Sequence, residues 1–221
     1  MSEAEPLIVY GLWRSNATYR VRVALNLKGV AFREIPVDLE AGEQSTPAFL
    51  ARNPFGAVPA LIGPDGIAIT QSLAILEYLD ELHPEPPLLP QDPRGRALVR
   101  ALAADVACDS HPLITTRIKT YLTGADFDAA AYRAWQGHWL SAGLEAIEAR
   151  LTASRDTGRF CFGDSVTTAD ICVSGLLLLT RLFRFETPRV PTVARIADTC
   201  WALDAFRKAD PMAQGDAPRP T

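Results

Sequence analysis

Ser15 lies where a predicted strand gives way to a predicted helix. It follows the apolar run at residues 7–10 and precedes a helical pattern that starts near Thr18. The first N–H groups of a helix are unpaired and stand at the positive end of its dipole, so they attract anions. Ser15 is therefore expected either to cap this helix or to help hold an anion there.

The Val58-Pro59 bond lies inside a second strand pattern. Proline cannot donate to a sheet ladder, so it belongs at an edge or a bend. A cis bond would turn the backbone of Val58 outward, where its N–H and C=O could pair with an extended peptide. An ordinary edge proline is the alternative interpretation.

Gln71 and Ser72 stand at the start of another helical pattern. The Ser72 hydroxyl can cap that helix, and the free N–H groups beside it can bind a carboxylate. Gln71 adds one donor and one acceptor. A plain N-cap is the simpler interpretation of Ser72. Together with Ser15 and Val58, these residues could hold three parts of one peptide-like anion.

The elements that must position these residues alternate between strands and helices. Their order, βαβ, then α, then ββα, predicts a small mixed sheet. Strands are expected at residues 6–11, 32–37, 57–62 and 67–70, and helices at 18–28, 47–52 and 72–82.

A proline-rich stretch then separates two kinds of pattern. Five prolines between His83 and Pro93 exclude the interior of a helix or a sheet. Beyond them only helical spacing is found, at residues 94–122, 129–151, 168–183 and 193–209. We therefore predict an α/β domain at 1–84, a linker at 85–93 and an all-α helical bundle at 94–221.

Three features of the helical part raise the question of function. His111-Pro112 falls within a helical pattern, which the proline must kink or break, and His111 is either a core residue or a ligand. Arg117 is six residues further on and would not share its face of an ideal helix. Thr167 and Asp170 match a capping box, which is a structural motif.

Composition excludes several classes of function. The chain has 221 residues, of which 48% are hydrophobic, and a net charge of −4, which disfavours nucleic acid as a partner. Neither a membrane span nor a signal peptide is expected, and the three histidines are too dispersed for a metal site. The lack of a CxxC pair indicates free, mostly buried thiols in a reducing, cytoplasmic setting; the cysteines are Cys108, Cys161, Cys172 and Cys200.

Six stretches resemble the glutathione transferase superfamily, zeta class, the group of maleylacetoacetate and maleylpyruvate isomerases. They follow the order of that family along nearly the whole chain. The segment CDSHP followed by Arg117 is similar to the bacterial maleylpyruvate type. The stretches are RSNATYRVRVALNLKGV, ARNPFGAVPAL, QSLAILEYLDELHPEPPLLPQDPRGRA, RALAADVACDSHPLITTRI, FCFGDSVTTADICV and LDAF.

The resemblance implies a thioredoxin-like N-terminal domain that binds glutathione, an all-α C-terminal domain and a homodimer. By this match Ser15 would donate a hydrogen bond to the glutathione sulfur, and Val58 would pair with the cysteinyl backbone. Gln71 and Ser72 would hold the γ-glutamyl end, and His111 would also reach glutathione.

The sequence departs from the family pattern at two positions. Ala17 stands where the animal type carries a cysteine. The bacterial type also tolerates a residue other than cysteine at this position. Leu182 stands where an arginine often precedes the phenylalanine matched by Phe183, although Arg181 and Arg184 flank it.

The expected reaction is the cis–trans isomerisation of a maleyl dicarboxylate in aromatic catabolism. A glutathione thiolate would add to the double bond, allow rotation and leave again, and Ser15 and the helix N-terminus would favour the anion. Arg14, Arg117 and Arg181 are the predicted partners of the substrate carboxylates, with Arg117 reaching across the cleft between the domains.

Two alternative functions are open. A broad glutathione transferase or dehalogenase would use Ser15 without an arginine clamp. A non-catalytic binding module of the same fold would not need Ser15, Gln71 and Ser72 together.

Overall fold

The computed structural model describes residues 6–218, and contacts divide the chain into two compact units. The first unit comprises residues 1–86 together with 204–221, and the second comprises residues 87–203. The sequence assigned everything after residue 93 to the helical domain, so the last segment differs from that expectation. It packs against a helix of the first unit.

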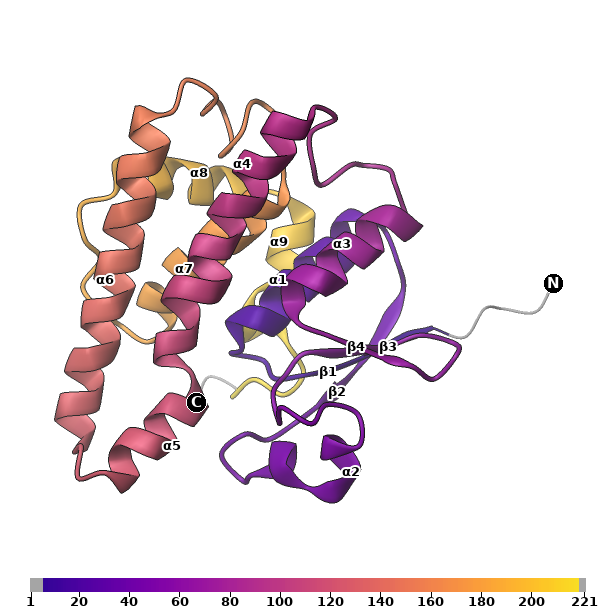
Figure 1. The fold of residues 1–221 in the computed structure, drawn as a ribbon, viewed down its shortest axis with the longest axis vertical. Helices are drawn as coiled ribbons and strands as arrows, with labels where there is room; N and C mark the ends of the chain where they lie inside the picture. The colour runs from indigo at the N-terminus through magenta and orange to yellow at the C-terminus, as the bar shows by residue number, and fades with distance from the viewer. Residues whose placement is uncertain (1–5, 219–221) are drawn as a thin grey trace. The chain divides into compact units, whose positions relative to one another are not determined.

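A four-stranded sheet with the order β2-β1-β3-β4 forms the first unit (Figure 1). The central strand β1 pairs in parallel with β2 and antiparallel with β3, which pairs antiparallel with β4. The predicted mixed sheet is therefore confirmed. The strands are β1 (Leu7–Gly11), β2 (Phe32–Pro36), β3 (Ala60–Ile62) and β4 (Ala68–Thr70).

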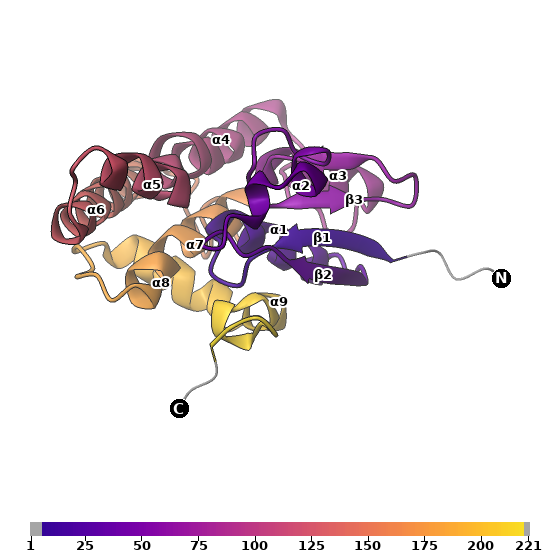
Figure 2. The ribbon, with the colours of Figure 1, turned by 90° about the horizontal axis from the view of Figure 1, so that it is seen from below.

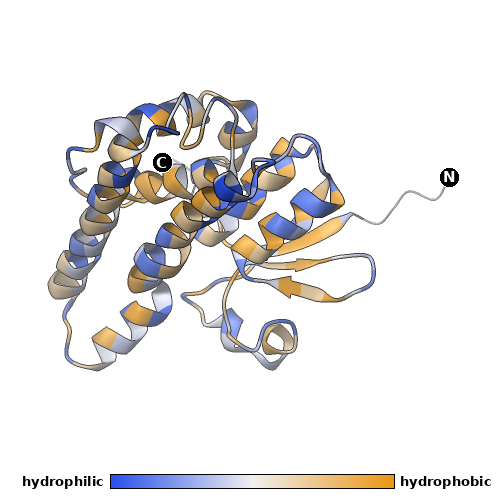
Figure 3. Cartoon of the chain, turned by 45° about the horizontal axis from the view of Figure 1, so that its top comes forward, coloured by the Kyte–Doolittle hydropathy of each residue, from blue (hydrophilic) through white to orange (hydrophobic). Residues whose placement is uncertain are grey.

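Two helices of the first unit, α1 (Asn16–Leu27) and α3 (Ser72–Leu82), lie side by side (Figure 1). The buried ammonium group of Lys28 joins them at one end, since it lies 2.6 Å from Asp80 Oδ1. A short helix, α2 (Pro47–Leu50), and a 3₁₀ turn at Glu43–Ser45 occupy the segment between β2 and β3. Figure 3 shows that the strands are largely hydrophobic and that hydrophobic and hydrophilic residues alternate along the helices.

The predicted helix at 193–209 is wrong as one element. Helix α8 (Pro191–Trp201) ends in the second unit, and α9 (Asp204–Ala209) begins in the first. Helix α9 packs on α1 (Figure 2), where Asn26 Nδ2 donates to the carbonyl of Ala205 at 3.0 Å. A 3₁₀ turn at Pro211–Ala213 follows.

The second unit is built around α7 (Thr168–Leu182), which is almost entirely buried and contacts α4 (Pro93–Ala104), α8 and α6 (Ala129–Ala153). The predicted capping box precedes α7 and is confirmed. Asp170 accepts hydrogen bonds from the N–H and hydroxyl of Thr167 at 2.8 and 2.7 Å. The motif is therefore structural. None of the helices within residues 6–218 is long and apolar enough to span a membrane.

The helical pattern predicted at 94–122 is interrupted near Pro112, where a kink or break was expected, and the interruption begins earlier, at Asp105. After α4 the chain forms a π-helical turn at Asp105–Ser110 and a 3₁₀ turn at His111–Ile114, and α5 (Thr116–Gly124) follows. Pro112 explains the break, because it removes a backbone donor and clashes with the preceding turn of a helix. His111 thus opens a short turn of its own.

Candidate functional site

A tight turn presents Ser15 at the N-terminus of α1. The Ser15 N–H donates to the carbonyl of Leu12 at 3.0 Å, and its hydroxyl oxygen accepts from the Thr18 N–H at 3.2 Å. The predicted cap is therefore present. Because the oxygen is the acceptor in that contact, the hydroxyl hydrogen remains able to donate. In the described part of the chain, the N–H groups of Asn16 and Ala17 form no hydrogen bond, as is usual in the first turn of a helix.

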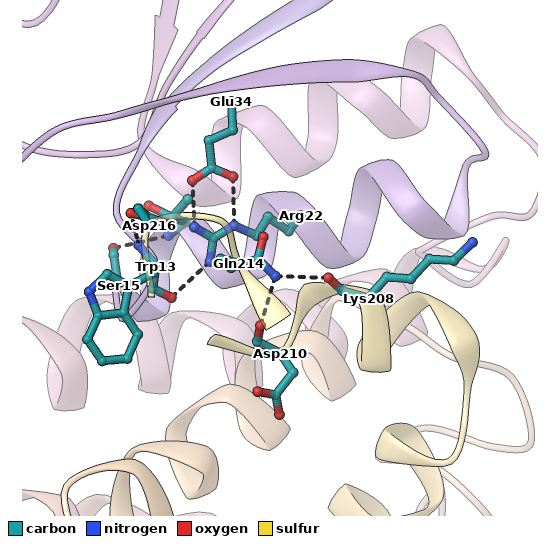
Figure 4. A network of polar contacts seen from close by, with 9 residues as sticks. Trp13, Ser15, Arg22, Glu34, Lys208, Asp210, Gln214 and Asp216 are labelled. Atoms are coloured by element: carbon teal, nitrogen blue, oxygen red, sulfur yellow. Dashed lines mark hydrogen bonds and ion pairs between the residues drawn. The ribbon is translucent and has the colours of Figure 1, made fainter. Parts of the chain in front are cut away.

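A buried ion pair fixes the turn before Ser15 (Figure 4). The Arg22 guanidinium donates to the two carboxylate oxygens of Glu34 at 2.7 and 2.5 Å and to the carbonyl of Trp13 at 3.0 Å. Gly11 leaves room for this arrangement, because a Cβ there would lie 2.6 Å from Glu34 Oε1 and 2.4 Å from a methyl group of Thr18.

The second helix N-terminus of the first unit belongs to α3. Ser72 is buried, and its hydroxyl oxygen accepts from Arg20 Nη1 at 2.7 Å, which again leaves the hydroxyl hydrogen available. Within residues 6–218, the N–H groups of Ser72, Leu73 and Ala74 form no hydrogen bond. Gln71 is exposed just before them, with a φ of 68°.

Arg20 connects these two helix ends. It is only 1% exposed, and its Nε and Nη2 donate to Asn16 Oδ1 at 3.3 and 2.9 Å while Nη1 reaches Ser72. Its positive charge adds to the dipoles of α1 and α3. The N-termini of both helices therefore favour a bound anion. Sequence reasoning missed Arg20. No local sequence pattern marks it, because its burial and its bond to Ser72 depend on a distant part of the chain.

Val58 lies in the loop before β3, and its bond to Pro59 is cis. Of the two alternatives that the sequence left open, this is the special one. The backbone N–H and C=O of half-buried Val58 form no hydrogen bond to any described residue. The loop is held by buried Asn53, whose side-chain amide donates to the Ala57 carbonyl at 2.7 Å.

The three candidate arginines have different surroundings. Arg14 pairs with Glu40 at 2.6 Å. Arg181 pairs with Asp198 at 3.1 Å and lies over the ring of Trp201, with 4.0 Å to its centroid. Arg117 is exposed on α5, and its guanidinium has no hydrogen bond or ion pair with the residues that the structure describes.

The site residues fall into two groups. Ser15 and Ser72 are linked in the first unit through Asn16 and Arg20. The second unit carries half-buried His111, together with Arg117 and Arg181. The approach of this second group to Ser15 stays a prediction.

Two buried thiols of the chain are poor nucleophiles. Burial raises the pKa of Cys161 well above its ordinary value, and the nearby Asp170 raises it further. Burial and the same carboxylate raise the pKa of Cys200. These groups stay protonated at neutral pH, so thiolate chemistry would need another thiol. Among the described residues, no group of three or more His, Cys, Asp or Glu side chains could hold a metal ion.

Comparison with known proteins decides the family. Residues 5–81 match the model of the glutathione S-transferase N-terminal domain. Over 212 residues the chain is 44% identical to a maleylpyruvate isomerase of Ralstonia sp., covering 95% of this chain and 99% of that protein. A solved maleylpyruvate isomerase described as a bacterial zeta-class glutathione S-transferase has a TM-score of 0.91 and 42% identity, covering 96% of this chain and 100% of the other. The chain belongs to the zeta class of the glutathione transferases.

Two other solved relatives of this zeta-class chain hold ligands. A maleylacetoacetate isomerase from Methylobacterium extorquens AM1, with bound malonate and glutathione, has a TM-score of 0.93 and 47% identity over 96% of this chain and 100% of the other. A maleylacetoacetate isomerase from Anaeromyxobacter dehalogenans 2CP-1 holds dicarboxyethyl glutathione and citrate. Its TM-score is 0.85 and its identity 39%, covering 97% of this chain and 98% of that one. The predicted thioredoxin-like N-terminal domain and glutathione transferase fold are confirmed.

The positive φ of Gln71 is expected to lower the free energy of unfolding of this zeta-class chain. A non-glycine residue at positive φ carries strain of about 1–3 kcal/mol, which glycine avoids at an entropic cost of about 0.5–1 kcal/mol. We expect Gln71→Gly to raise the free energy of unfolding by up to about 2 kcal/mol, measured by urea denaturation with an unchanged m-value.

A matched control is Gln91→Gly, at an exposed position of the linker where φ is not positive. It should lower the free energy of unfolding. If Gln71→Gly destabilises the protein as well, the backbone at position 71 stores no strain.

Proposed function

We propose that this zeta-class chain is a glutathione-dependent isomerase that converts a maleyl dicarboxylate, maleylpyruvate or maleylacetoacetate, into its fumaryl form. The observation that carries the proposal is the Ser15 hydroxyl at the open N-terminus of α1, where Asn16 and Ala17 offer unpaired N–H groups. Near full-length similarity to isomerases with these names supports the choice of reaction.

Glutathione is the proposed cofactor, extended between the two helix N-termini. Its γ-glutamyl carboxylate binds at α3, where Ser72 and Gln71 offer donors and Arg20 supplies positive charge. The cysteinyl backbone pairs with the open N–H and C=O of Val58, as a neighbouring strand would. The sulfur then lies at Ser15, with His111 as a further contact from the second unit.

The first chemical task is to hold the sulfur as a thiolate. A free thiol has a pKa of about 8.5, and surroundings such as a helix N-terminus or a neighbouring cation lower such values to roughly 3.5–7.5. The Ser15 O–H donates to the anion, while its oxygen keeps the Thr18 N–H as the cap of α1. One hydroxyl thereby serves the helix and the chemistry together.

The thiolate then adds to one carbon of the maleyl double bond. A C–S bond forms, and the electron pair of the double bond moves to the conjugated carbonyl as an enolate. Rotation follows about the resulting single bond. The enolate electrons restore the double bond in the trans form and expel the thiolate, so that no atom is gained or lost.

The ligand of one relative supports this route. Dicarboxyethyl glutathione, bound in the isomerase from Anaeromyxobacter dehalogenans 2CP-1, is a thioether between the glutathione sulfur and a dicarboxylate carbon. It has the covalent connection that the proposed addition forms. Arg117 is the proposed carboxylate partner, because Arg14 and Arg181 are engaged with Glu40 and Asp198. The homodimer and the cytoplasmic location stay predictions.

The proposal is tested by comparing two reactions at catalytic amounts of glutathione. An isomerase converts many equivalents of maleylpyruvate or maleylacetoacetate for each glutathione present, as followed by ¹H NMR. A broad transferase instead consumes one glutathione for each aryl chloride and leaves the maleyl compound unchanged. A binding module does neither. Either of the last two results would overturn the proposal.

Ser15→Ala should lose most turnover and keep the fold. Removing one positioned donor to a catalytic anion costs about 10²–10³ in kcat. Loss of the cap costs about 1 kcal/mol of stability, which a thermal melt records separately. The paired control is Ser15→Thr, because threonine keeps both the cap and the hydroxyl. Unchanged turnover in the alanine variant would mean that another group activates the sulfur.

Arg117→Ala should weaken only reactions of carboxylate substrates. A charged hydrogen bond contributes about 1.5–3 kcal/mol, so kcat/KM for the maleyl substrate should fall roughly tenfold to a hundredfold. Conjugation of a neutral aryl chloride, if detectable, should be nearly unaffected.

Arg155→Ala is the matched control, since Arg155 is an exposed arginine of the second unit whose guanidinium has no hydrogen bond or ion pair with the described residues. Equal losses on both substrates would make Arg117 structural. Full activity on both would remove it from the site.

A further inference from the structure

The end of the chain reaches the turn that presents Ser15. The Trp13 N–H donates to Asp216 Oδ2 at 2.9 Å, although 203 positions separate the two residues in the sequence (Figure 4). Both residues belong to the first unit. The C-terminal segment is therefore part of the structure around Ser15.

Side-chain amides hold the path of this segment. Helix α9 is joined to α1 by the bond from Asn26 Nδ2 to the Ala205 carbonyl. Further along, Gln214 Nε2 donates to the carbonyls of Lys208 and Asp210 at 2.9 and 2.8 Å, which turns the chain back on α9 (Figure 4). Asp216 follows two residues later and is half-buried.

The Ser15 turn is consequently held at three polar groups. Asp216 binds the N–H of Trp13, Arg22 binds its carbonyl, and the Leu12 carbonyl binds the N–H of Ser15. Trp13 takes part in the first two of these bonds and lies within the turn that the third closes, so its peptide groups set the orientation of the residues that follow. Without Asp216, one side of the turn has no anchor.

We propose that Asp216 is a positioning residue, which acts through Trp13 to aim the Ser15 hydroxyl at the thiolate. The C-terminal segment 204–216 thereby completes the sulfur end of the site. This inference rests on the proposed function for its effect on catalysis. Asp216 itself need not touch glutathione or substrate.

The test compares two substitutions of different chemistry. Asp216→Ala removes the acceptor, and a small misplacement of a catalytic group can cost up to about a hundredfold in rate. We expect kcat to fall about tenfold while KM for glutathione changes less than about threefold, because the γ-glutamyl end is bound at α3. Asp216→Asn keeps an acceptor oxygen without the charge and should stay within about threefold of the unaltered protein.

Two further readouts separate positioning from general damage. The absorbance of the glutathione thiolate should titrate at higher pH in Asp216→Ala than in the unaltered protein or in Asp216→Asn. Glu81→Ala, which removes an exposed carboxylate of α3, serves as a control and should leave both measurements unchanged. An unchanged kcat in Asp216→Ala would overturn the inference. So would a loss that appears only as a raised KM for glutathione.

Amide hydrogen exchange decides the inference without glutathione. The Trp13 N–H should be protected in the unaltered protein and in Asp216→Asn, and should exchange faster in Asp216→Ala at an equal melting temperature. Equal protection in all three proteins would contradict the role of Asp216. Absence of glutathione binding in the unaltered protein would instead refute the proposed function and leave the exchange result to judge the turn.

Discussion

The candidate site depends on the hydrogen bonds of the buried Arg20 guanidinium. A charge removed from water must be hydrogen-bonded, since a buried and unpaired charge costs several kcal/mol. Asn16 and Ser72 are among the groups that bind it, so the first turn of α1 and the first residue of α3 are tied together. Each helix N-terminus has unpaired N–H groups of its own, and the Arg20 contacts hold the first turn of α1 beside Ser72 at the start of α3.

Two ion pairs of the first unit hold α1 in place at its two ends. Lys28 and Asp80 join α1 and α3 at one end, and the Arg22–Glu34 pair fixes the turn before α1. The second unit contributes differently. Its capping box starts the buried helix α7 and takes no part in chemistry, whereas the break at Pro112 gives His111 its own short turn.

Local signals in the sequence predicted what local physics determines. The cap at Ser15, the capping box and the order of strands and helices in the first unit all depend on neighbouring residues, and each was confirmed. The sequence predicted a kink or break at Pro112, but the π-helical turn after α4 has no comparable signature, so the division of this segment into four elements was not predicted. The contact of Asp216 with Trp13 and the burial of Arg20 depend on distant partners, and no pattern of neighbouring residues encodes them.

The central claim is that the N-terminus of α1 holds glutathione as a thiolate. The most direct measurement is a ¹³C NMR titration of glutathione labelled at the cysteinyl β-carbon and bound to the unaltered protein, because that shift reports ionisation of the sulfur. The account predicts a pKa of about 7.5 or lower for the bound thiol. A bound thiol that titrates at about 8.5 or higher, as free cysteine does, would contradict it.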